Sequence, residues 1–242
     1  MHGGAWLSGS SWDVEPYLRI LAAEGFTAVG LNYTLAPEAA YPVAVRELND
    51  ALAHLVERAD ELGIDADRIV LAGDSAGAQL AAQLAALTTG RDYASLVGIR
   101  PALRSEQLRA VVLNCGVYDL HALADLTGLL GWGFKTAMWA YSGTKDWSAS
   151  PAGHTMSTVR HVTGDFPPTY ISARQRRRAD RDAVGSDGGG PPRGGRGRDG
   201  ALLAGRPRAG PAARVPVPPR LPGGRTMRSP RRSRSCARGT AE

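Results

Sequence analysis

The chain has 242 residues, enough for one α/β domain with a sizeable core, and its 43% hydrophobic content excludes a wholly disordered or fibrous protein. It contains no run of 18 apolar residues and no basic leader before an apolar stretch, so we expect no membrane span, no signal peptide and a cytoplasmic location. Cys115 and Cys236 are the only cysteines, and neither has a His/Cys cluster beside it. We therefore predict no disulfide framework, no metal and no cofactor.

The net charge of +6 averages two unlike segments that meet near Ala173. Residues 174–242 carry 18 Arg, no Lys and 5 acidic residues, and every Phe, Tyr and Trp lies in residues 1–173. An Arg-, Gly- and Pro-rich segment without aromatic side chains cannot bury enough surface to offset its ordering entropy. The sequence therefore predicts an α/β domain over residues 1–173 and a disordered tail over residues 174–242.

Helical and strand patterns alternate along the first segment. Helices are predicted after Trp12 up to Gly25, after Pro42 up to Gly63, and from Ala76 to Leu87. Short apolar runs of strand length are found at 26–31, 68–72, 110–114 and 169–172. Alternation of this kind favours right-handed crossovers and a mostly parallel sheet with helices on both faces.

Residues 73–77 read Gly-Asp-Ser-Ala-Gly and lie between a predicted strand and a predicted helix. In that setting the pattern is typical of a nucleophile elbow, where small flanking residues allow a sharp turn that exposes the serine hydroxyl. We predict that Ser75 is the catalytic nucleophile.

A glycine loop, His-Gly-Gly-Ala-Trp, occupies residues 2–6. Such a loop can aim main-chain N–H groups into a cleft, where they stabilise the oxyanion of a tetrahedral intermediate. The predicted donors are Gly3, Gly4 and Ala76. His2 is interpreted as a structural hydrogen-bonding residue rather than the catalytic base.

Together these motifs resemble the hormone-sensitive-lipase-like branch of the α/β-hydrolases, a family of carboxylesterases. The resemblance covers residues 1–173 and rests on the segments 2–6, 32–38, 73–77 and 166–173. It implies an α/β-hydrolase fold and a serine acyl hydrolase of short-chain esters, with a small-molecule ester or amide substrate. It implies no metal or organic cofactor, no membrane partner and no specific nucleic acid. Kynurenine-formamidase-like relatives share both motifs, so an arylformamidase-like amide hydrolysis stays open.

The same resemblance implies a cap over the acyl pocket in residues 121–165. An apolar stripe at helical spacing runs through this stretch, and it can line a lid or belong to an ordinary packed helix. Its members are Leu126, Leu130, Phe134 and Met138. Asp119, just before the cap, is interpreted as a cap or turn residue rather than a catalytic acid.

The acid and histidine that complete a serine triad are missing from their expected places. In this fold they follow the serine, first the acid and then the histidine, but no histidine occurs after His161. Asp180 and Asp182 belong to a charged run without a structural frame. The available histidines precede the expected point and are predicted to be solvated or packed; they are His54, His121, His154 and His161. The chain as written is therefore predicted to be impaired or inactive.

A reading-frame change would explain both the tail and the missing residues. With GC-rich codons read one base later, Arg174–Ala183 becomes Gly-Asn-Ala-Asp-Ala-Leu-Thr-Ala-Thr and Gly205–Ala209 becomes Ala-Asp-His-Glu, which resemble the family's acid and histidine segments. Our hypothesis is a frameshift at or near Ala173. Met1 directly precedes the glycine loop, so we also expect an N-terminal truncation and a sheet that is incomplete at both ends.

Two further hypotheses remain, one about the tail and one about the whole gene. Its Arg-Gly segment at 193–197 could hold nucleic acid through phosphate contacts that are sequence-blind and steeply salt-dependent, because the tail lacks aromatic residues for base stacking. Alternatively, the gene is a decayed remnant without function.

Overall fold

The structure is a computed structural model, and it describes residues 1–172. The helices are α1 (Glu15–Ala23), α2 (Val43–Glu57), α3 (Ala59–Leu62), α4 (Ala76–Thr89), α5 (Arg91–Val97), α6 (Gly128–Ser142) and α7 (Pro151–Met156). The strands are β1 (Ile69–Asp74), β2 (Leu108–Asn114) and β3 (Thr169–Ser172), and the short 3-10 helices are η1 (Ser105–Gln107), η2 (His121–Leu123) and η3 (Thr158–Arg160). The predictions for residues 174–242 lie outside the described residues.

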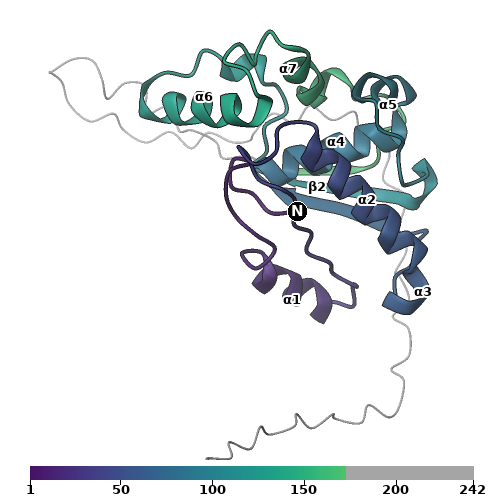
Figure 1. Ribbon diagram of the computed structural model, residues 1–242. Helices are drawn as coiled ribbons and strands as arrows, with labels where there is room; N and C mark the ends of the chain where they lie inside the picture. The colour runs from purple at the N-terminus through teal and green to yellow at the C-terminus, as the bar shows by residue number, and fades with distance from the viewer. Residues whose placement is uncertain (173–242) are drawn as a thin grey trace, which may run out of the picture. The chain divides into compact units, whose positions relative to one another are not determined.

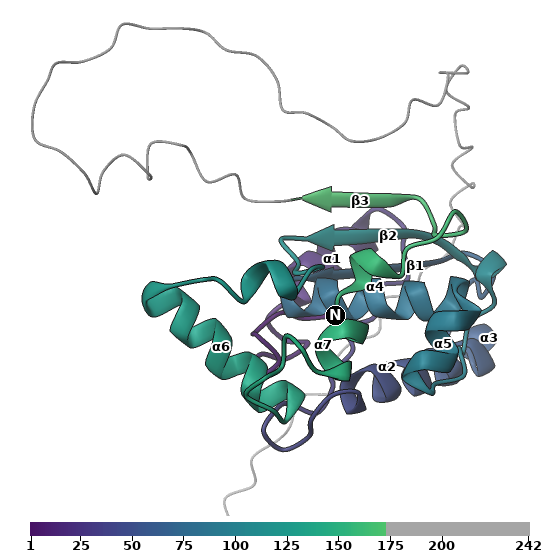
Figure 2. The same ribbon diagram turned by 90° about the horizontal axis from the view of Figure 1, so that it is seen from above.

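The three strands form a parallel sheet in the order β1-β2-β3, as the alternating pattern predicted. Asp74 pairs with Asn114, and Asn114 pairs with Ser172, so the carboxyl ends of all three strands meet at one edge. The strands run side by side toward this edge, and α6 lies beyond it (Figure 2). Any residue that directly follows β1 is therefore placed at the carboxyl edge, where open α/β sheets bind their ligands.

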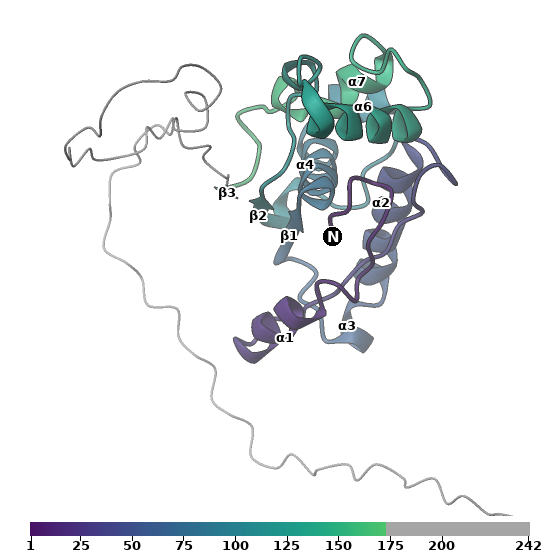
Figure 3. The same ribbon diagram turned by 90° about the vertical axis from the view of Figure 1, so that its left-hand side faces the viewer.

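Helix α4 is the centre of the packed core. Every residue from Ala76 to Leu87 is buried, including the polar side chains of Gln79 and Gln83. α4 and α2 cover one face of the sheet, and α1 lies on the other side (Figures 1 and 3). Leu48 of α2, Leu80 and Leu84 of α4 and Val111 of β2 are all fully enclosed in this core.

The strand predicted over residues 26–31 is absent from the structure. This segment makes no ladder with the described strands, and Phe26 and Val29 are exposed. The apolar run was sufficient for a strand prediction, but a strand forms only where a neighbouring strand can pair with it. Helix α5, which follows Gly90, was not predicted.

The cap segment contains one long helix, α6, whose inner side is packed. Met138 and Tyr141 are fully buried, and the Phe134 ring meets Trp147 edge-on with their centroids 5.8 Å apart. The predicted stripe thus contributes to the core through Phe134 and Met138. Trp132 lies on the exposed side of the helix.

Strand β3 pairs only with β2 among the described residues. Its two central side chains, Tyr170 and Ile171, are 62% and 56% exposed. On β1, Val70 is also exposed. The sheet therefore presents apolar side chains to solvent in the part of the chain that the structure describes.

We expect Leu84→Ala to lower the free energy of unfolding by about 2–5 kcal/mol, because it opens a cavity beside a fully packed helix. Urea unfolding followed by circular dichroism measures the change. The control is Leu96→Ala on α5, where the side chain is 54% exposed and we expect a change within about 0.5 kcal/mol. Equal effects of the two substitutions would contradict the core described above.

Candidate active site

Ser75 occupies a tight turn between the last residue of β1 and the first residue of α4. Its backbone dihedrals are φ 51° and ψ −117°, a conformation that residues with a Cβ rarely adopt and that stores strain of about 1–3 kcal/mol. Two hydrogen bonds hold it in place. The Ser75 N–H donates to the Asn114 carbonyl of β2 at 2.8 Å, and the Gln79 N–H donates to the Ser75 carbonyl at 3.2 Å.

The two glycines of the 73–77 motif are required by close backbone contacts. A Cβ on Gly73 would overlap the carbonyl group of Gly77. A Cβ on Gly77 would overlap the carbonyl groups of Met1 and His2. The motif therefore brings the strand against the helix and also brings the N-terminal segment against the first turn of α4.

We expect Gly77→Ala to reduce thermal stability sharply, because rigid backbone on the neighbouring segment leaves no room for the new methyl group. The matched control is Gly133→Ala. Gly133 also lies in a helix but has nothing within 4 Å of an added Cβ, so we expect the protein to be unchanged or stabilised by up to about 1 kcal/mol. Melting temperatures followed by circular dichroism compare the two, and equal melting temperatures would contradict the contact.

His2 is part of the packed structure, in agreement with its predicted structural role. The imidazole is buried and stacks on the Tyr33 ring with a centroid distance of 4.4 Å and an interplanar angle of 7°. Its Nδ1 lies 2.8 Å from the Gly3 carbonyl oxygen, and the Tyr33 hydroxyl donates to the His2 carbonyl at 3.1 Å. These contacts fix the start of the glycine loop.

The glycine loop lies directly beside the serine turn. The Gly3 N–H donates to Oδ1 of Asp74 at 2.9 Å, and a Cβ on Gly3 would lie 3.1 Å from the Ser75 Cβ. Gly4 has φ 115° and accepts hydrogen bonds from the N–H groups of Leu7 and Ser8, which closes the loop into a turn. Segments 71 residues apart thus share one edge of the sheet.

The three predicted oxyanion donors differ in what they bind. The Gly3 N–H is already engaged by the Asp74 carboxylate. Within residues 1–172, the N–H groups of Gly4 and Ala76 donate to no protein oxygen. Ala76 is the first residue of a 14-residue helix, so its N–H also lies at the positive end of the helix dipole.

Known proteins resemble this chain in sequence and in fold. Residues 1–182 match the family model described as the alpha/beta hydrolase fold. The chain belongs to this family. An acetyl esterase of Salmonella choleraesuis is 35% identical to this chain over 122 residues, which cover 50% of the chain and 34% of that enzyme.

Solved esterase structures share the fold. Esterase B from Lactobacillus rhamnosis superposes with a TM-score of 0.60 at 26% identity, over 70% of this protein and 52% of that chain. An esterase from Pyrobaculum calidifontis superposes with a TM-score of 0.54 at 27% identity, over 70% and 54% of the two chains. The matched part of this chain spans about a third of the length of the acetyl esterase and about half the length of these two esterases.

None of the described histidines forms a hydrogen bond with Ser75. His54 is exposed on α2, and His121 lies in η2. The Nε2 atom of His161 is 3.1 Å from the His154 carbonyl oxygen, and these two rings lie against each other 5.2 Å apart. No triad base is therefore identified within residues 1–172.

Asp119, the acid that the sequence analysis considered after β2, is not placed as a triad acid either. The Asp119 carboxylate accepts hydrogen bonds from the N–H groups of His121 and Ala122 at 3.1 and 3.4 Å, which is the behaviour of the predicted turn residue. Asp180 and Asp182 lie outside the described residues. No group of three or more His, Cys, Asp or Glu side chains suited to a metal occurs in the described part, and none of its helices is long and apolar enough to cross a membrane.

An aromatic cluster joins the glycine loop to the cap. Trp6 stacks on Tyr141 of α6 with a centroid distance of 5.1 Å, and Tyr41 meets Tyr141 edge-on at 6.1 Å. The Tyr41 N–H donates to the Tyr141 carbonyl at 2.7 Å. Burial raises the pKa of the Tyr41, Tyr93 and Tyr141 hydroxyls, because the low-dielectric surroundings disfavour the phenolate.

These tyrosines predict alkaline unfolding. Their pKa values are raised above the value of about 10 in the unfolded chain, so the folded state keeps protons that the unfolded state releases, and stability falls as the pH rises above about 10. Tyrosinate absorbance and circular dichroism should change together in this range. Tyr141→Phe keeps the ring stack but removes one ionisable group, so its unfolding midpoint should move to higher pH. Tyrosinate formation by these residues with an unchanged dichroism spectrum would contradict the prediction.

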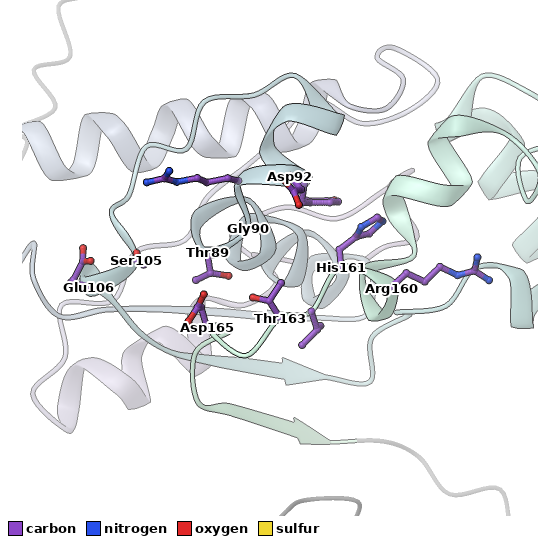
Figure 4. A pocket seen from close by; sticks show the side chains of 12 residues that line it. Thr89, Gly90, Asp92, Ser105, Glu106, Arg160, His161, Thr163 and Asp165 are labelled. Carbon is purple, nitrogen blue, oxygen red and sulfur yellow. The ribbon is translucent and has the colours of Figure 1, made fainter.

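A hollow of about 900 Å³ lies at the other end of α4 from Ser75. It is lined by residues from the end of α4, the start of α5, η1 and the segment after η3, among them Thr89, Asp92, Glu106, His161 and Asp165 (Figure 4). The 14 residues of α4 separate the two sites, which corresponds to about 21 Å at 1.5 Å per residue. This hollow is therefore separate from the elbow.

Proposed function

We propose that this hydrolase carries the nucleophile and oxyanion donors of a serine acyl hydrolase that cleaves short-chain carboxylic esters. The observation that carries the proposal is the placement of Ser75, in a strained turn at the carboxyl edge of the sheet with the Gly3 loop against its Cβ. The similarity to an acetyl esterase and to two esterases of known structure supports an ester substrate.

The proposed chemistry is acyl transfer through a covalent intermediate. Ser75 Oγ attacks the ester carbonyl carbon, the bond from that carbon to the alkoxy oxygen breaks, and the alcohol leaves with the serine proton. Water then attacks the acyl-enzyme, which releases the carboxylic acid and restores the hydroxyl. The N–H groups of Gly4 and Ala76 are the proposed donors to the tetrahedral oxyanion, and each such donor contributes ~3 kcal/mol to lowering the barrier.

The leaving group decides which substrates are accessible. An amide nitrogen must be protonated before it leaves, a step that the triad histidine performs as general acid. An activated phenolate leaves without that help. A serine turn that has no histidine in contact should therefore be acylated by an activated ester and not by an anilide, which favours ester over formamide chemistry here.

We expect p-nitrophenyl butyrate to place one butyryl group on Ser75, with release of one p-nitrophenolate. Peptide mass spectrometry after acid quenching locates the group. Ser75→Ala should carry none. Butyryl groups at equal level in both proteins, or on other side chains alone, would refute Ser75 as the nucleophile.

Steady-state turnover of the same ester should be very slow. Loss of triad members typically removes ~10⁴ to 10⁶ of kcat, because nothing takes up the serine proton during attack. The difference between wild-type and Ser75→Ala rates at neutral pH measures the enzymatic part. A Ser75-dependent rate typical of esterases, on the order of 10 s⁻¹, would contradict the predicted impairment.

A further inference from the structure

The Asp74 carboxylate connects the serine turn to the glycine loop. Asp74 is the last residue of β1, directly before Ser75, and its side chain is exposed. Its Oδ1 accepts the Gly3 N–H at 2.9 Å, and a Cβ on Gly3 would lie 2.5 Å from its Oδ2. The carboxylate is therefore seated against the loop backbone, and its charge strengthens the hydrogen bond.

Other contacts hold the start of the loop, and Gly4 is bound within the loop's own turn through its carbonyl. Tyr33 binds the His2 carbonyl, and the first turn of α4 packs on the carbonyls of Met1 and His2. Beyond His2, the described bond from the loop to the serine turn is the one between Gly3 and Asp74. The Gly4 N–H lies in the same planar peptide unit as the Gly3 carbonyl, whose oxygen is 2.8 Å from His2 Nδ1. The Asp74 bond to the Gly3 N–H and this His2 contact therefore hold the residue before Gly4 from its two sides.

The carboxylate also acts on its surroundings electrostatically. Burial, and secondly the Asp74 charge, raises the pKa of the Tyr33 hydroxyl. Tyr33 stacks on His2, so the charge of Asp74 reaches the groups that support the loop. Asp74, the second residue of the 73–77 motif, thus contacts the loop through a hydrogen bond and also acts on its supporting residue Tyr33 through its charge.

We propose that Asp74 is a positioning residue for ester hydrolysis: by holding the Gly3 N–H, its carboxylate aims the Gly4 N–H at the point that the Ala76 N–H also faces. This inference rests on the proposed function. It gives the carboxylate a role distinct from that of a triad acid, since it binds a backbone amide and no histidine. A displacement of about 1 Å at such a donor lowers the rate by ~100-fold.

The hydrogen bond from the Gly3 N–H to the Asp74 carboxylate, called the anchor below, is tested first, by a measurement that needs no substrate. Hydrogen exchange of the Gly3 amide, followed by NMR on protein with ¹⁵N-labelled glycine, should be slow in the wild type and in Asp74→Asn, which keeps an acceptor oxygen. In Asp74→Ala it should be at least ten times faster. The matched control is Asp65→Ala, since Asp65 is also exposed and accepts a backbone N–H, from Asp67, but lies before β1 at the opposite end of the strand.

The consequence for chemistry is tested by the rate of butyrylation of Ser75 at several ester concentrations. Asp74→Ala should lower the maximal rate ~100-fold with little change in the half-saturating concentration, because the oxyanion exists only in the transition state. Asp74→Asn should stay within a few-fold of the wild type, and Asp65→Ala should match it. A purely structural role would instead lower the melting temperature and leave the maximal rate of the folded protein unchanged.

The outcomes separate the two proposals. An unprotected Gly3 amide in the wild type, or equal exchange in Asp74→Ala, overturns the anchor. A protected amide with an unchanged butyrylation rate in Asp74→Ala overturns the positioning role. Absence of butyryl transfer to Ser75 in the wild type overturns the proposed function and with it the catalytic consequence, while the exchange data still decide whether the anchor exists.

Discussion

The arrangement at the carboxyl edge depends on one steric constraint, the contact of three backbone segments without side chains between them. Gly73 packs directly against the backbone of Gly77, and Gly77 packs directly against the carbonyls of Met1 and His2. Because of this contact β1 can pass directly into α4, and Ser75 must turn through a left-handed conformation to connect them. The buried helix supplies the packing that offsets the strain of that turn.

The same constraint brings the glycine loop to the serine. The first two residues lie on the first turn of α4, and Gly3 then contacts Asp74 and Ser75. The aromatic stack of Trp6 on Tyr141 then connects the loop to α6. Nucleophile, loop and cap helix are thus linked in series, and each link is a direct contact between residues distant in the sequence.

Local patterns in the sequence were sufficient to predict β1, α4 and the turn between them, because apolar runs and glycines at residues 69–77 act over a few residues. The strand predicted over residues 26–31 was wrong, since pairing depends on a neighbouring strand that the local sequence does not specify. The bond between Gly3 and Asp74 was also missed. It requires the folded positions of residues 71 apart, although an acid before the serine was a signal that could have suggested it.

The exposed outer strand has a consequence for handling the protein in solution. Within residues 1–172 the outer side of β3 pairs with no other strand, and Tyr170 and Ile171 are exposed beside it. An unpaired edge strand can pair with a strand of another molecule, and aromatic and β-branched side chains strengthen such self-association. Dilute samples and mild denaturant during purification therefore suit this chain better than concentrated stocks.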